Sequence, residues 1–133
     1  MHKVLNRIKN KKGQSIVEMA LILPIIMLLF MGILDFGRIM NSQIQISSAS
    51  RSGARLAAIG KSDSDIINMI SISTNTLKPA NLIVTITPNQ AARSSEDIVT
   101  VLVEYDIQVL TPGVSLITGN PYRLSSDTSM IVE

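Results

Sequence analysis

The chain has 133 residues, enough for one small domain and one membrane span but not for two domains. It has no cysteine, which excludes disulfides and thiolate chemistry, and with two Phe, two Tyr and no Trp its core must be aliphatic. The formal net charge of +2 arises at the N-terminus, where residues 1–13 hold five of the twelve basic residues and no acidic one. The remainder has a net charge of −3, which argues against nucleic acid as a partner.

Residues 16–34 predict a transmembrane helix. This run of 19 residues has Glu18 as its only charge, and about 17 to 25 apolar residues suffice to cross a bilayer. The basic segment before it favours a cytoplasmic N-terminus and an exoplasmic C-terminal part. A cleaved secretory signal peptide is the competing interpretation, but the apolar run exceeds the usual core of about 7 to 15 residues. The first cluster of small residues, at 47–49, also comes late for a cleavage site.

Helical periodicity continues beyond this run. Asp35 and Arg38 are three residues apart and can form an ion pair. We expect one helix from about Ser15 to Ala58, about 65 Å long at about 1.5 Å per residue, with Gly60 as its C-terminal stop. The segment 48–58 is rich in small residues, which favours close packing of the helix against a sheet over a binding role.

Residues 61–133 predict a small exoplasmic α+β domain. The turn at 61–65 has N-cap residues for a short second helix that Pro79 closes. A period of two then predicts strands at 82–87 and 99–109, and a weaker one at 122–132. Three strands in series with short loops predict an antiparallel three-stranded meander packed on the second half of the long helix.

The junction at Gly13 has the strongest functional signal. Gly13 is followed by Gln14, and Glu18 lies at the fifth position after the glycine, where an ionisable group at the mouth of a membrane span is a functional hypothesis. This arrangement resembles the prepilin processing site of type IV pilins, in which a membrane peptidase cuts after the glycine. The stretch 13–58 resembles, more narrowly, the TadE family of pseudopilins from tight-adherence (Tad/Flp) pilus systems. Residues 49–55 are similar to the family's Ala-Ala-Arg-x-Gly-Ala-Arg block, with Ser50 in place of an alanine.

The resemblance implies a minor pilin or pseudopilin. Residues 1–13 would be a basic prepilin leader, removed by cleavage between Gly13 and Gln14, and residues 14–60 would form the long helix. Glu18 would pair with the new α-amino group during assembly, although Met19 follows it where an aromatic residue is more usual. The implied partners are a prepilin peptidase, other pilin or pseudopilin subunits and the pilus assembly platform. The implied location is the cytoplasmic membrane, crossed once, or the pilus itself.

The sequence also leaves an alternative from a different functional class. The same segments suit an uncleaved, signal-anchored protein whose exoplasmic domain binds or senses a ligand.

Catalytic and metal chemistry find little support. The only histidine, His2, lies in the expected leader, and the serines lack a recognisable base. Asp63 and Asp65 are better explained as helix caps than as metal ligands, because calcium takes six to eight oxygens. Acidic residues at 96, 97, 104 and 106 favour solvated positions. We therefore expect no enzyme activity, no cofactor and no metal.

Overall fold

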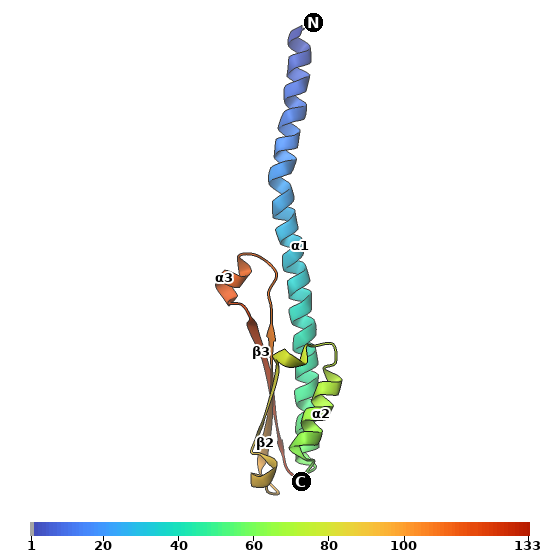
Figure 1. Ribbon diagram of the computed structural model, residues 1–133, viewed down its shortest axis with the longest axis vertical. Helices are drawn as coiled ribbons and strands as arrows, with labels where there is room; N and C mark the ends of the chain where they lie inside the picture. The colour runs from blue at the N-terminus through green and yellow to red at the C-terminus, as the bar shows by residue number, and fades with distance from the viewer. Residues whose placement is uncertain (1) are drawn as a thin grey trace.

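The computed structural model describes residues 2–133, and side chains from Gly13 onward. A single long helix, α1 (His2–Ala58), forms the axis of the molecule, and the remaining elements pack along its C-terminal half (Figure 1). The fold is α+β, as expected, but α1 begins well before the predicted start at Ser15. Residues 2–12 include helix-favouring Lys, Arg and Leu, and one interior glycine costs a helix only about 1 kcal/mol, so the helix continues through Gly13.

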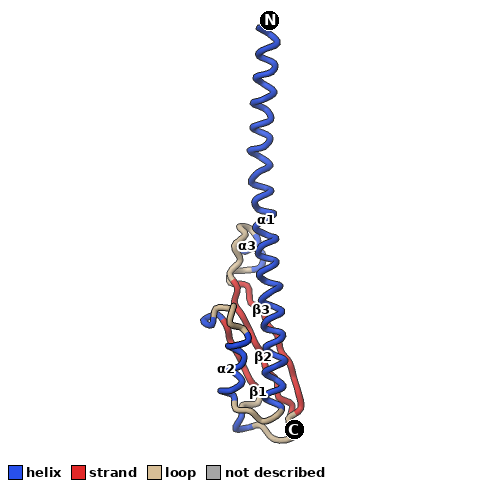
Figure 2. The backbone as a smooth tube through the Cα atoms, turned by 90° about the vertical axis from the view of Figure 1, so that its right-hand side faces the viewer, coloured by secondary structure: helices blue, strands red, loops and turns tan. Residues whose placement is uncertain are grey.

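Three strands form one antiparallel sheet in the order β1-β2-β3: β1 (Leu82–Thr87), β2 (Ile98–Ile107) and β3 (Tyr122–Ile131). The register pairs Leu82 with Tyr105 across the first ladder and Val101 with Thr128 across the second. The sheet lies along α1 over its C-terminal half (Figure 2). The predicted meander is therefore confirmed, with β2 as its central strand.

The core lies between one face of the sheet and the C-terminal half of α1. β2 supplies its middle with alternate buried residues: Val99, Val101, Val103, Tyr105 and Ile107. From α1 it receives Ile46 and several alanines, and from α2 (Asp63–Ser73) it receives Ile66 and Ile70. On the opposite face, Asp106 lies beside Arg123, whose Nε donates to Asp106 Oδ1 at 2.8 Å.

The second helix has the predicted cap but ends earlier than predicted. The Ser62 hydroxyl oxygen accepts a hydrogen bond from the Asp65 backbone N–H at 3.2 Å. The helix ends at Ser73 and not near Pro79, since the hydroxyls of Ser73 and Thr74 both donate to the Ile70 carbonyl at 2.9 and 2.8 Å. Side-chain bonds of this kind compete with helix propagation.

Three short helical turns were not predicted: η1 (Pro79–Asn81), η2 (Gln90–Ala92) and α3 (Val114–Thr118). α3 interrupts the connection between β2 and β3, and it is framed by Gly113 and Gly119 with φ values of 91° and 79°. Glycine adopts this left-handed backbone region without steric cost, so the two residues permit the sharp entry to and exit from α3.

Candidate functional site

The Gly13 junction is an uninterrupted, exposed part of α1. A Cβ placed on Gly13 would meet no heavy atom within 4 Å, so packing does not require a glycine here. Gln14 and Glu18 lie four residues apart, one turn along the same face of the helix, and both are exposed. Among the described residues, Glu18 has no hydrogen-bond or ion-pair partner. The carboxylate is therefore free to meet a charge near residue 14 or on another molecule.

The apolar run that follows is entirely uncovered. α1 is long and apolar enough to cross a membrane, and none of its most apolar stretch is buried by the rest of the protein. A core helix of a soluble protein would be covered along this stretch. The uncovered residues include Ile16, Leu21, Ile25, Leu29, Phe30, Ile33 and Leu34. This exposure supports the predicted span at 16–34.

The small residues at 47–49 lie inside the packed half of the same helix. Ile46 and Ala49 are buried in the domain core. A signal-peptide cut at this place would remove part of the core, which makes the secreted-protein interpretation less favourable.

Asp35, the first residue after the apolar run, binds the segment that follows β2 in the sequence. Its Oδ2 accepts hydrogen bonds from the backbone N–H of Leu110 at 2.9 Å and from the N–H and hydroxyl of Thr111, both at 2.7 Å. Its Oδ1 accepts from Arg38 at 3.1 Å, which confirms the expected pair. The Asp35 side chain is nevertheless buried, and the sequence did not indicate this loop anchor.

Two opposed effects act on the pKa of Asp35. Burial raises it, but the hydrogen bonds from Thr111 and Leu110 and the positive charge of Arg38 together outweigh burial and lower the pKa below its ordinary value. The charged form of Asp35 therefore stabilises the folded state.

The small-residue segment of α1 packs closely on the core, as predicted. A Cβ on Gly53 would lie 2.9 Å from Ile70 Cδ1 and 3.2 Å from Val101 Cγ1, so only glycine allows this approach without adjustment. Ser50 is fully buried, and its hydroxyl donates to the Val101 carbonyl at 2.9 Å and lies 2.9 Å from the Thr128 hydroxyl. The Ser50 hydroxyl thus binds α1 to β2 and β3.

The two arginines of the same segment point away from this interface. Arg51 and Arg55 are exposed, and Arg51 donates to the Ser47 hydroxyl one turn earlier at 3.4 Å. The arginines face solvent while the small residues of the segment pack on the core, which agrees with a packing role for the segment.

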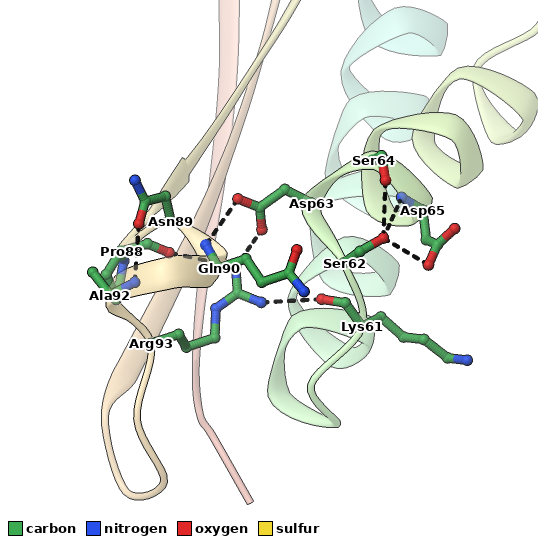
Figure 3. A network of polar contacts seen from close by, with 10 residues as sticks. All are labelled: Lys61, Ser62, Asp63, Ser64, Asp65, Pro88, Asn89, Gln90, Ala92 and Arg93. Carbon is green, nitrogen blue, oxygen red and sulfur yellow. Dashed lines mark hydrogen bonds and ion pairs between the residues drawn. The ribbon is translucent and has the colours of Figure 1, made fainter.

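An ion pair that the sequence did not indicate connects α2 to the loop after β1 (Figure 3). The Arg93 side chain is only 3% exposed and bonds Asp63 Oδ1 at 2.6 Å and the Lys61 carbonyl at 3.2 Å. Asp63 Oδ2 accepts from the Gln90 backbone N–H at 2.9 Å. Asp63 is therefore a structural partner of Arg93, whereas Ser62 performs the capping.

The acidic residues considered for metal binding are separated or paired. Asp63 binds Arg93, Asp97 accepts a bond from the Ser94 N–H at 2.8 Å, and Glu104 and Asp106 lie beside Arg123. In the portion of the chain that the structure describes, no group of three or more His, Asp or Glu side chains is arranged to hold a metal ion.

Comparison with known proteins bears on the N-terminal helix alone. Neither the curated proteins nor the solved structures contain a match to this chain. Residues 13–55, from the glycine of the junction to the last arginine of the small-residue segment, match the family model described as TadE-like protein, in agreement with the resemblance of these residues.

Proposed function

We propose that this protein is a minor pilin or pseudopilin of a Tad/Flp pilus system. It inserts into the cytoplasmic membrane through residues 16–34, is cut between Gly13 and Gln14 by a prepilin peptidase, and assembles with other pilin subunits and the pilus assembly platform. The TadE-like family is pilus-associated and is not an enzyme family, and the role is structural.

The observation that carries the proposal is Gly13 itself. A glycine inside a helix costs about 1 kcal/mol relative to alanine, and neither packing nor backbone angle calls for one at this position. Gly32 and Gly37 are also open, but they lie within or next to the apolar run, where glycine is frequent in membrane helices. A peptidase that recognises the residue before the cleaved bond would explain the glycine at position 13. The low helix propensity of glycine would also ease local unwinding of the helix at that bond.

Glu18 supports the same scheme. Cleavage would create an α-amino group on Gln14, one helical turn from the Glu18 carboxylate. In a membrane an unpaired charge is costly, so the amine and a carboxylate of the same or a neighbouring subunit would stabilise one another. The exposure of Glu18 leaves it accessible to either partner.

The charge distribution supports the orientation. Five basic residues precede the span, and the segment after it is acidic on balance. Short basic flanks are retained in the cytoplasm, which would place the sheet domain on the exoplasmic side.

The test is processing by a cognate prepilin peptidase expressed in the same cells. Gly13→Val should leave the precursor uncut, because the branched side chain would not fit a site shaped for glycine. Gly37→Val is the matched control, an equally open glycine of the same helix, and it should be processed like the unsubstituted chain. Equal processing of both variants would contradict the proposal and favour the uncleaved, signal-anchored binding protein.

A further inference from the structure

The connection between β2 and β3 presents an uncovered apolar patch, formed by Leu110, Val114, Leu116 and Ile117 and named here the α3 patch. Leu116 and Ile117 are 89% and 88% exposed, more than any of the large hydrophobic residues of the apolar run in α1. The whole stretch 109–121 carries no charged residue. Water-facing aliphatic side chains on an uncharged surface are typical of a site that another apolar phase covers.

Asp35 places this patch at the membrane end of the domain. It is the first residue after the apolar run, and its carboxylate accepts hydrogen bonds from the N–H groups of Leu110 and Thr111. The start of the patch is therefore bound to the point where α1 leaves the run. In both views, α3 lies at the end of the domain nearest the N-terminal half of α1 (Figures 1 and 2).

We infer that the α3 patch inserts into the interfacial layer of the exoplasmic leaflet, beside the exit of α1, and gives the domain a second attachment to the membrane. The inference rests on the proposed membrane insertion of residues 16–34. A lipid surface is the occupant that the position favours, because the patch lies at the end of the domain where α1 leaves its apolar run (Figure 1).

The chemistry of the loop suits this environment. Insertion buries no charge, and removal of Leu116 and Ile117 from water is favourable. Tyr122 begins β3 just after the loop and is 37% exposed, and tyrosine is enriched at membrane–water interfaces. Two attachments would restrict rotation of the sheet about the axis of α1, so that one side of the domain is presented to neighbouring subunits.

The test measures lipid contact in the full chain reconstituted in phosphatidylcholine/phosphatidylglycerol vesicles. Since the chain has no cysteine, an environment-sensitive fluorophore can be attached through single substitutions. Leu116→Cys reports on the patch, and Met27→Cys reports on insertion of the span. Ile72→Cys is the matched control, an exposed aliphatic position on α2 at 66% exposure. Quenching by nitroxide-labelled lipid and by aqueous iodide is recorded for each.

The expected result is strong quenching at residue 116 by a shallow nitroxide lipid and protection there from iodide, at all lipid-to-protein ratios. Residue 72 should show the opposite behaviour. Adding Ile117→Asp to the labelled Leu116→Cys chain should reduce the lipid quenching, whereas adding Ile72→Asp should not.

Three results would overturn the inference. If residue 116 behaves like residue 72 while residue 27 is quenched by the nitroxide lipid, lipid contact of the α3 patch is rejected and the proposed span is left intact. Protection that disappears as the protein is diluted in lipid would identify a second copy as the occupant. Absence of quenching at residue 27 would contradict membrane insertion, and the inference would fail with it.

Discussion

Some single residues belong to a short sequence motif, whereas others have partners that are distant in the sequence. Gly13 and Glu18 are predicted from their spacing and from the apolar run beside them, and their roles stay predictions. The burial of Asp35 could not, because its partners at 110 and 111 are brought to it only by the sheet. The pair between Asp63 and Arg93 is of the same kind, joining residues on two elements that no short motif connects.

Glu18→Ala should leave insertion, processing and folding intact but prevent association with partner pilins. Removing one member of a buried charge pair costs about 3 to 5 kcal/mol, which lowers an association constant by more than two decades. Crosslinking to other pilins and pilus yield measure the effect. Glu18→Asp is the control and should be partly tolerated, since it keeps the charge. Wild-type association of the alanine variant would reduce Glu18 to an interfacial polar residue.

Asp35→Asn should destabilise the domain by about 1 to 3 kcal/mol. The substitution removes the carboxylate charge that the hydrogen-bond donors at 110 and 111 stabilise, and the new amide can turn an N–H group toward Arg38. The folded-state pKa of Asp35 is lowered, so its contribution is complete above the ordinary pKa of about 3.9 and is lost as pH falls through the folded value.

Denaturant unfolding in detergent micelles checks this pH dependence. The difference in the free energy of unfolding between wild type and Asp35→Asn should be constant from pH 7 to about pH 5 and decrease below about pH 4. A difference that stays constant or grows in acid would show that the carboxylate charge is not the source of the stabilisation.

Elements were predictable where their periodicity was long. The strands could be read from alternation in β1 and β2, and the long helix from its apolar stripe and the stop at Gly60, which has a φ of 77°. α3 could not be predicted, because its five residues are too few to show a helical repeat of apolar residues and none of them is buried. The early end of α2 depends on hydroxyl bonds to Ile70, which apolar spacing does not reveal.

Close contact between α1 and the sheet makes Gly53 sensitive to volume. Gly53→Val should destabilise the domain by about 1 to 3 kcal/mol through overpacking against Ile70 and Val101. Gly53→Ala should be nearly neutral, because the end of the Ile70 side chain can move and alanine favours the helix by about 1 kcal/mol.

Thermal unfolding of the two Gly53 variants is compared with that of Gly37→Val. The comparison distinguishes the effect of overpacking from the effect of valine on helix propensity. Gly37 has open space around it, so valine there meets no neighbour. Equal loss of stability in Gly53→Val and Gly37→Val would mean that the fit between α1 and the sheet is looser than its geometry indicates.

At the scale of the whole molecule, one helix serves two environments. Its first half presents uncovered apolar residues, and its second half supplies one wall of the core through small side chains. The α+β class and the antiparallel meander were predictable, because short loops between successive strands leave few other arrangements. The position of the α3 patch beside the end of the apolar run was not, because it depends on the Asp35 anchor.

The N-terminal sequence of the wild-type chain recovered from cell membranes tests the central claim most directly. With a cognate prepilin peptidase present, the account predicts a chain that begins at Gln14, and without the peptidase one that begins at Met1. A chain that keeps Met1 under both conditions would contradict the pilin assignment and favour the signal-anchored protein. A chain that begins near residue 50 would instead identify a secreted product.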